Sequence, residues 1–309
     1  MFKILGYYVS GNSSSKRSLL NNYNKTDIIL PTWLKLKADG SIVSNKINNE
    51  IKKLKRLKEN KAIVPVVQNY QLSSEVSNNF IKNKRKWTET ITELIKFIKQ
   101  GNYNSLNIDI EGIKKQNKDK LTNFIEKLAY ALNDVGYKVS ISLPAKTEDN
   151  HSAWSGAYDY QELGRLVNYV IIMAYDYHWV NGPPGAIAPL TWVQDTIDYA
   201  VMKIDINKIY LGIPCYGYDW LIDSPKEEAQ GLSYSQVMNL KEKNGVSVNW
   251  DQESETPYIK YRDKNGNHEV WFENKDSIIK KINLIKEFQL AGAAFWRLGL
   301  EDSGIWKYL

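Results

Sequence analysis

The sequence alternates short apolar, β-branched runs with amphipathic segments, and this alternation constrains the fold more than any other feature. The runs are, in order, KILGYYV, DIILPTW, AIVPVVQN, SLNIDIE, KVSISLP, YVIIMAY, KIYLGIPCY and AGAAFW. Between them, NNEIKKLKRLKEN, KWTETITELIKFIKQ and LTWVQDTIDYAVMKI carry apolar residues at three- and four-residue spacing, which predicts helices. Strands that alternate with helices favour a parallel sheet. Eight such units in 309 residues predict an α/β fold, a closed (β/α)8 TIM barrel.

The seventh and eighth runs are further apart than the others. Residues from about 218 to about 275 contain a helix-like SYSQVMNLKEKN and then PYIKYRDKNGNHEVWF. The second segment has two alternating runs around a Lys-Asn-Gly-Asn turn, which is typical of a β-hairpin. We therefore expect a single domain over residues 1–309, with a small α+β insertion at about 218–275 that walls one side of the barrel mouth.

Charge and cysteine content narrow the possible partners. The chain has 41 Lys and Arg against 35 Asp and Glu, a net charge of +6, which fits a solvated basic surface or an acidic polymer as partner. It shows no phosphate loop and no zinc-type or nucleic-acid motif, so we expect no metal and no nucleic-acid partner. Cys215 is the single cysteine; no intrachain disulfide can form, and its apolar context predicts a buried small residue.

The sequence also bears on the compartment. The N-terminal MFKILGYYVSGNSSS lacks the apolar stretch and cleavage site of a secretory signal. No apolar run approaches the ~20 residues that span a membrane. We expect a monomer that has no signal peptide and does not bind membranes.

The run SLNIDIEGI places Asn107, Asp109 and Glu111 at alternate positions, with apolar residues between them. In a barrel strand the apolar set packs against the helices, and the polar set points into the interior toward the mouth. Buried carboxylates are costly unless they share hydrogen bonds, and such pairs have shifted pKa values. The pattern indicates either an acid/base site or a hydrogen-bonded polar layer without a catalytic role.

This acidic run resembles the signature of glycoside hydrolase family 18, the chitinase family, which reads Asp-Gly-x-Asp-x-Asp-x-Glu. Asp109 and Glu111 match its last two positions, whereas Asn104, Ser105 and Asn107 replace the first Asp, the Gly and the middle Asp. The resemblance implies a substrate-assisted retaining mechanism, in which the acetamido oxygen of the substrate is the nucleophile.

Three further motifs extend the resemblance over essentially the whole chain. IIMAYDYHW is similar to the Met-x-Tyr-Asp motif of the family through Met173, Tyr175 and Asp176. AAFWRLG matches its eighth strand, where Trp296 corresponds to the Trp under the bound sugar, and GYYV resembles its first strand. The chain is most similar to the branch of spore-cortex fragment-lytic glucosaminidases, through the runs PTWLKLKADGSI, VPVVQN, MAYDYHW, APLTWV, LGIPCYGYDW and FWRLGLED.

The resemblance assigns roles to individual residues. Glu111 is expected to be the general acid, Asp109 to orient the acetamido group, and Tyr175 to hydrogen-bond its carbonyl. Asn107, which cannot share a proton, is expected to leave Asp109 more firmly ionised. No cofactor is expected, and His178 is expected to be a hydrogen-bonded loop residue. The expected substrate-binding residues are Asn107, Asp176, Met173 and Trp296, together with the residues at strand ends Tyr8, Trp33, Gln68, Asn69, Trp179, Tyr216 and Trp220.

These observations predict a glycosidase that cleaves β-1,4 bonds after N-acetylglucosamine in peptidoglycan, in particular in spore-cortex fragments. A chitinase or chitooligosaccharide hydrolase is the enzymatic alternative. A lectin-like barrel that only binds carbohydrate is the alternative of another class, and the presence of Glu111 argues against it. The resemblance also implies a spore-associated protein, in the coat or cortex, made in the mother-cell cytoplasm; otherwise the protein is expected to be cytoplasmic.

Overall fold

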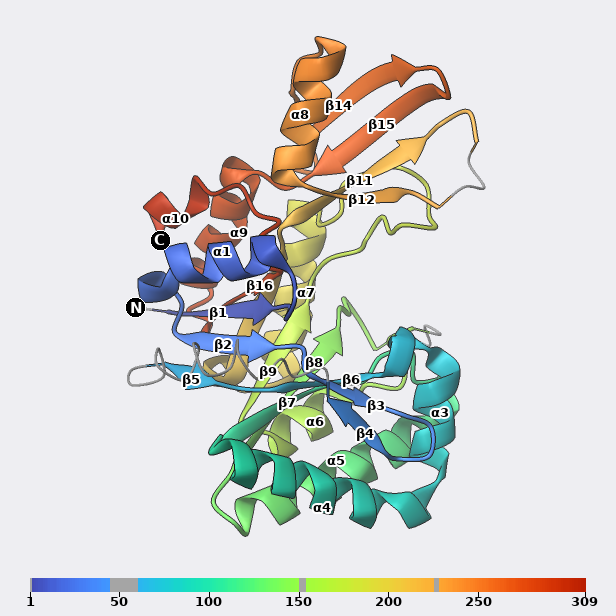
Figure 1. The fold of residues 1–309 in the computed structure, drawn as a ribbon, viewed down its shortest axis with the longest axis vertical. Coiled ribbons are helices and arrows are strands. Elements are labelled where there is room, and N and C mark those ends of the chain that lie inside the picture. The colour runs from blue at the N-terminus through green and yellow to red at the C-terminus, as the bar shows by residue number, and fades with distance from the viewer. Residues whose placement is uncertain (1, 45–60, 150–153, 225–227) are drawn as a thin grey trace.

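The computed structural model describes residues 2–44, 61–149, 154–224 and 228–309. The helix predicted from NNEIKKLKRLKEN lies outside the described residues. All eight predicted runs form strands of one sheet (Figure 1). They are β1 (Lys3–Tyr8), β2 (Ile28–Pro31), β5 (Ala62–Ile63) with β6 (Val66–Asn69), β7 (Ser105–Asp109), β8 (Lys138–Pro144), β9 (Tyr169–Met173), β10 (Ile209–Pro214) and β16 (Gly292–Trp296).

The sheet closes on itself through two interrupted strands. β2 continues into β3 (Leu34–Leu36) and β5 continues into β6, and the first of these composite strands pairs with the second through β2 with β5 and β3 with β6. β1 pairs with β2 and β16, and β6 pairs with β7, so the parallel pairings run round the ring without a free edge. β4 (Ile42–Ser44) adds to β3 in antiparallel fashion. The predicted (β/α)8 barrel is confirmed.

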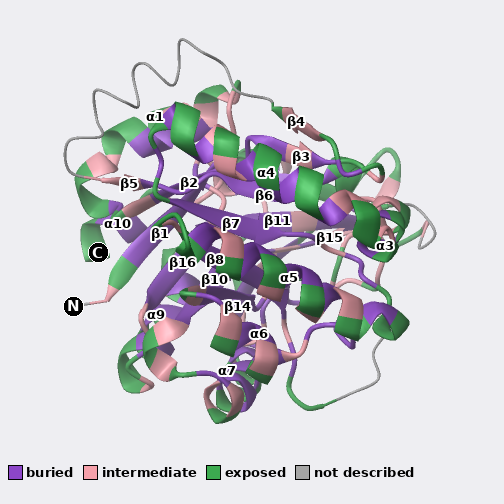
Figure 2. Ribbon diagram, turned by 90° about the horizontal axis from the view of Figure 1, so that it is seen from below, coloured by how far each residue is buried: buried purple, intermediate pink, exposed green. Residues whose placement is uncertain are grey.

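Helices surround this barrel, with their buried faces toward it (Figure 2). In α4 (Lys84–Gly101), Trp87, Ile91, Leu94 and Ile98 recur every three or four residues and are all buried. The other helices that the structure describes around the barrel are α1 (Ser13–Asn21), α3 (Ser74–Lys82), α5 (Lys118–Asn133), α6 (Tyr160–Leu166), α7 (Leu190–Lys203), α9 (Lys275–Glu287) and α10 (Ile305–Tyr308). Short 3-10 turns are η1 (Tyr23–Lys25), η2 (Tyr70–Leu72), η3 (Lys115–Asn117) and η4 (Ile206–Lys208).

Side chains separate into two layers, as the strand alternation predicts. Leu106, Ile108 and Ile110 of the acidic run pack outward in one cluster with the helix residues Phe124 and Leu128. The barrel interior holds a smaller apolar cluster of Leu5, Tyr7, Leu30, Val64, Val66, Ile171, Tyr210 and Ala294. Polar side chains above this cluster therefore lie at the carboxyl ends of the strands, where barrel enzymes place their sites.

A second, antiparallel sheet stands beside the barrel mouth, between β10 and β16 in the chain (Figure 1). Its strand order is β12-β11-β15-β14-β13, from β11 (Tyr216–Leu221), β12 (Gln230–Ser233), β13 (Asn249–Asp251), β14 (Thr256–Asp263) and β15 (Gly266–Phe272). α8 (Tyr234–Asn244) covers one face, and its Val237 packs with Ile259, Val270 and Phe272. We call residues 216–272 the inserted lobe.

A buried ion pair joins the end of this lobe to the barrel. The Lys281 ammonium lies 3.0 Å and 2.8 Å from the two carboxylate oxygens of Glu273, and the Ser277 hydroxyl donates to Glu273 Oε2 at 2.6 Å. The side chains of Glu273 and Lys281 are 0% and 1% exposed. Glu273 follows β15, and Lys281 lies in α9 on the barrel, so the pair fixes the chain where it re-enters the barrel.

We expect Lys281→Met to lower the free energy of unfolding by about 3–5 kcal/mol, because it leaves the Glu273 carboxylate buried without its cation. Lys86→Met is the matched control: its partner Glu89 lies at 2.9 Å, but the pair is exposed to solvent, and its loss should destabilise the protein far less. Urea unfolding of both variants measures the difference. Equal losses would show that the buried pair contributes no more than a surface pair.

Candidate active site

A polar layer lies inside the barrel beneath its mouth. The fully buried Asn107 donates from Nδ2 to Ser140 Oγ at 3.0 Å and accepts at Oδ1 from Ser142 Oγ at 3.0 Å. The Tyr7 hydroxyl lies 2.9 Å from Ser142 Oγ. Asn107 was expected to contact substrate, but the structure places its amide in this supporting layer.

Asp109 lies one step higher in a row across three neighbouring strands. Lys35, Gln68 and Asp109 are direct partners in the strand register. Lys35 Nζ donates to Gln68 Oε1, and Gln68 Nε2 donates to Asp109 Oδ2 at 2.9 Å. Asp109 Oδ1 is buried and has no hydrogen-bond partner among the described residues, so it is available to a donor on a ligand.

Burial raises the pKa of Asp109 to about 6, although Gln68 and Lys35 act in the opposite direction. Removing this carboxylate from water therefore makes it harder to ionise than an exposed Asp. The expectation that Asn107 leaves Asp109 more firmly ionised than an Asp at that position would is a separate comparison and stays a prediction.

Glu111 follows β7 at the mouth and is only partly exposed. Its backbone N–H donates to Asn69 Oδ1 at 3.0 Å, and its carbonyl accepts from Ser77 Oγ at 2.7 Å. Burial raises the pKa of Glu111 to about 8, and the negative charges of Asp109 and Asp176 contribute. Between these two pKa values Asp109 is ionised and Glu111 is protonated, which is the state required of a carboxylate beside a general acid.

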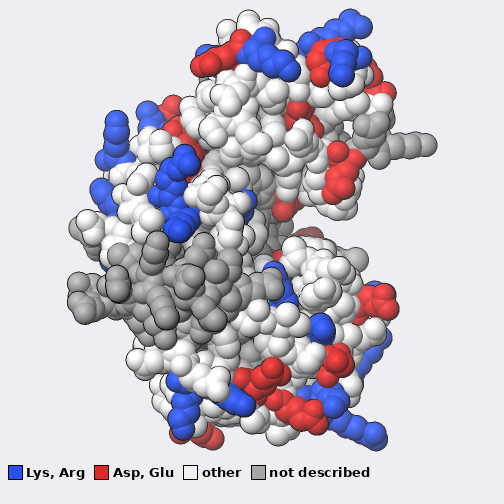
Figure 3. Space-filling view, in the orientation of Figure 1, with Lys and Arg blue, Asp and Glu red and all other residues white. Residues whose placement is uncertain are grey.

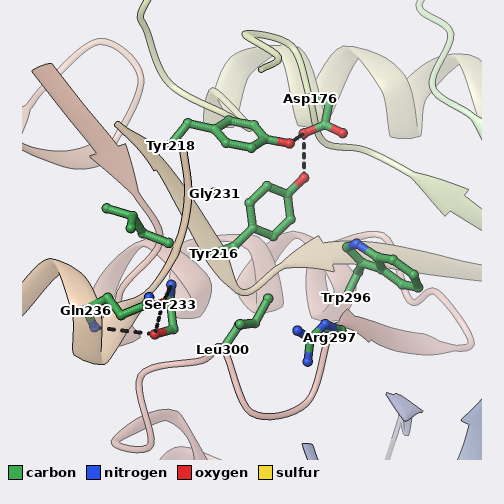
Figure 4. A pocket seen from close by; sticks show the side chains of 10 residues that line it. Asp176, Tyr216, Tyr218, Gly231, Ser233, Gln236, Trp296, Arg297 and Leu300 are labelled. Atoms are coloured by element: carbon green, nitrogen blue, oxygen red, sulfur yellow. Dashed lines mark hydrogen bonds between the residues drawn. The ribbon is translucent and has the colours of Figure 1, made fainter. Parts of the chain in front are cut away.

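Aromatic side chains and Asp176 form the opposite wall. Trp296 ends β16 and packs edge-on to Tyr7, with ring centroids 4.9 Å apart. Tyr175 stands beside Gly212, where a Cβ atom would lie 3.0 Å from the tyrosine ring. Figure 4 shows Asp176 accepting from two hydroxyls of the inserted lobe, Tyr216 at 2.5 Å and Tyr218 at 3.0 Å. The lobe therefore helps to position a residue of the barrel mouth.

The remaining candidates divide between supporting and exposed positions. Tyr8 and Trp33 are 1% and 0% exposed and pack within the outer core, so a contact of either side chain with substrate stays a prediction. Gln68 and Asn69 contact Asp109 and Glu111, respectively, and both are buried. Strand-end position alone does not determine which side chains are buried, and this burial is what the sequence did not predict.

The remaining candidates lie in or beside the loop that follows β9. Trp179 is half exposed, whereas Trp220 is buried and donates from Nε1 to Gly182 O at 2.9 Å. Met173 is 9% exposed at the end of β9. His178 Nδ1 lies 3.0 Å from Pro183 O, a loop hydrogen bond as expected.

Three further residues at the mouth, Lys35, Tyr218 and Arg297, were not predicted from the sequence. Lys35 was detectable as a cation between the buried Leu34 and Leu36 of a strand. Arg297 follows the motif Trp296 and lines the pocket described below. Across the described ranges, no group of three or more His, Cys, Asp or Glu side chains could hold a metal ion. No helix in the described part of the chain is long and apolar enough to cross a membrane.

The family described as "Glycosyl hydrolases family 18" matches residues 3–301. The chain belongs to this family and is a glycosidase. It is 30% identical over 251 residues to the "Cortical fragment-lytic enzyme" of Bacillus subtilis (strain 168), a match that covers 80% of this chain and 58% of that protein.

Two solved structures are similar over the whole fold. The spore cortex-lytic enzyme SleL of Bacillus megaterium QM B1551 has a TM-score of 0.89 and 29% identity, covering 99% of this chain and 73% of that chain. A chitinase from Chromobacterium violaceum ATCC 12472 has a TM-score of 0.90 and 26% identity, covering 99% and 97%.

The two carboxyl groups predict a bell-shaped pH profile of kcat/KM. Activity should rise near pH 6 as Asp109 ionises and fall near pH 8 as Glu111 loses its proton. Initial rates from pH 4 to 10 on a soluble N-acetylglucosamine oligosaccharide measure both limbs. A profile that stays flat from pH 5 to pH 9 would contradict this assignment.

Lys35→Met should move both limbs to higher pH, because removal of a nearby cation makes both carboxyl groups harder to ionise. At pH 5.5, where ionised Asp109 limits the rate, kcat/KM should fall about three- to tenfold. Lys37→Met is the matched control, since Lys37 is exposed two residues further along the chain. If Lys37→Met shifts the profile as far, the effect comes from net charge and not from the Lys35–Gln68–Asp109 row.

Proposed function

We propose that the chain hydrolyses β-1,4 bonds after N-acetylglucosamine in peptidoglycan, with spore-cortex fragments as the substrate class. The observation that carries this proposal is the pair Asp109 and Glu111. A buried oxygen of Asp109 has no hydrogen-bond partner in the described ranges, and the pKa of the nearby Glu111 carboxyl group is raised to about 8. The names of two relatives, a cortical fragment-lytic enzyme and a spore cortex-lytic enzyme, support spore-cortex peptidoglycan as the substrate.

In the first step, Glu111 donates its proton to the glycosidic oxygen as the bond from that oxygen to the anomeric carbon breaks. The acetamido oxygen of the same sugar attacks the anomeric carbon and closes a five-membered oxazolinium-type ring. Asp109 Oδ1 accepts the acetamido N–H, fixes its orientation and stabilises the positive charge that develops. The Tyr175 hydroxyl hydrogen-bonds the acetamido group, and Trp296 packs under the apolar face of the sugar.

In the second step, the Glu111 carboxylate removes a proton from water as the water oxygen attacks the anomeric carbon. The ring opens and regenerates the acetamido group, so the anomeric configuration is retained after two inversions. Lys35 and Gln68 hold Asp109 in place throughout.

A chitinase is the second candidate, favoured by the similarity in fold to the Chromobacterium violaceum enzyme. The central sugar is N-acetylglucosamine in both reactions, and the candidates differ in the neighbouring sugars. We further propose that the protein acts in the spore, because the relatives that support the substrate are spore enzymes by name.

Digestion of purified cortex fragments, vegetative peptidoglycan and chitin oligosaccharides tests the proposal, with new reducing ends identified by mass spectrometry. The chain should release products that end in N-acetylglucosamine from the wall substrates. Glu111→Gln should lower kcat about 10²- to 10⁴-fold, because it cannot donate or remove the proton. Glu75→Gln is the matched control, since Glu75 is exposed on α3.

Preferential cleavage of chitin would move the assignment to the second candidate. If the unmodified chain and Glu111→Gln both bind saccharides and neither cleaves them, the protein is a lectin-like barrel.

A further inference from the structure

A pocket opens between Trp296 and the inserted lobe, next to the candidate active site (Figure 4). Its volume is about 340 Å³, within the range of about 300–1,000 Å³ that is usual for small-molecule sites. In Figure 3 the molecule is hollowed between the inserted lobe and the opposite side of the barrel mouth. The residues that line the pocket are Asp176, Tyr216, Tyr218, Gly231, Leu232, Ser233, Gln236, Trp296, Arg297 and Leu300.

Arg297 is the one cation in this lining, and its guanidinium is poorly satisfied. It is partly buried, and within the described part of the chain it donates one long hydrogen bond, 3.5 Å from Nη1 to Leu298 O. It forms no ion pair with any of the described residues. The nearby Glu301 carboxylate accepts hydrogen bonds from the Gly299 backbone N–H at 2.5 Å and from Trp306 Nε1 at 3.0 Å. A guanidinium with open donors in a partly dry pocket is suited to a carboxylate.

The other charge of the lining lies across the pocket from Arg297. Asp176 accepts the hydroxyl protons of Tyr216 and Tyr218, and Figure 4 shows it on the far side of Tyr216. A ligand carboxylate bound at Arg297 therefore lies beside a cation. The negative charge of Asp176 lies across the pocket, and its carboxylate already accepts two hydrogen bonds.

The ring order of the barrel places the proposed acid and this pocket on opposite sides of the mouth. Glu111 follows β7 and Arg297 follows β16, and these strands are four positions apart in either direction round the barrel. The proposed acid protonates the oxygen on the reducing side of the central sugar. A sugar chain that crosses the mouth would therefore bring the non-reducing side of that sugar to the pocket opposite Glu111.

We propose that this pocket binds a carboxylate-bearing sugar unit, joined to the non-reducing side of the central N-acetylglucosamine, through its carboxylate to Arg297. This inference rests on the proposed function. In peptidoglycan the sugar at that position is N-acetylmuramic acid, whose lactyl ether ends in a carboxyl group when no peptide is attached. Chitin has no acidic group there, so Arg297 would distinguish the two polymers.

Binding to a catalytically disabled chain tests the pocket. Glu111→Gln is titrated calorimetrically with a muramic acid–N-acetylglucosamine oligosaccharide that has free lactyl carboxylates, with the same saccharide reduced to the alcohol, and with its peptide-bearing form. The free carboxylate should bind about 10- to 100-fold more tightly than the alcohol. Adding Arg297→Gln should remove this difference and leave binding of the alcohol unchanged.

Arg262→Gln is the matched control, because Arg262 is exposed on β14 of the same lobe. Arg297→Lys should retain part of the preference, since it keeps the charge without the two-pronged geometry. The comparison of free acid with alcohol on the Glu111→Gln chain needs no change at Arg297. It therefore remains decisive if the Arg297 variants fold poorly.

The outcomes separate the two proposals. Equal binding of acid and alcohol, together with cleavage of both by the unmodified chain, overturns the carboxylate pocket and leaves the proposed function standing. Cleavage of chitin oligosaccharides with no binding of either muramic saccharide overturns the proposed substrate and the pocket together. Tighter binding of the peptide-bearing form than of the free acid assigns Arg297 to a peptide carboxylate and overturns the lactyl assignment.

Discussion

The cost of keeping two carboxyl groups in the mouth of a closed barrel governs the surrounding structure. Asp109 is stabilised by Gln68 and, through it, by Lys35, so one cation is coupled to the site without contacting the carboxylate. The Glu111 carboxyl group has no comparable hydrogen-bond partner among the residues that the structure describes, and its pKa rises further. β7 and the segment directly after it thus supply two carboxyl groups in different protonation states, because their neighbours differ.

The inserted lobe is part of this arrangement. Its Tyr216 and Tyr218 hydroxyls hold Asp176 of the barrel, and Asp176 in turn raises the pKa of Glu111 by its charge. The buried pair of Glu273 and Lys281 fixes the lobe at its exit. The geometry of the mouth therefore depends on a segment that the barrel itself does not require for closure.

Residues at the centre of the site and residues at its margin are suited to different parts of a substrate. Asp109, Glu111, Tyr175 and Trp296 suit a sugar with an acetamido group, which chitin and peptidoglycan share. The positive charge of Arg297 at the margin is suited to an acidic group on the sugar joined to it. Family membership and fold thus define the reaction, and discrimination between polymers falls to the pocket between barrel and lobe.

The sequence by itself determined the barrel and the acidic pair. Strand periodicity and motif spacing are local, so the eight runs, the alternation around Asp109 and the motif at Tyr175 could be interpreted without long-range contacts. Only the tertiary structure decided which side chains are open to a ligand. Trp33 is covered by the outer core, and Lys35 meets Gln68 through a pairing of strands 33 residues apart. Exposure, pKa and partnership arise from neighbours distant in the chain, which local pattern does not encode.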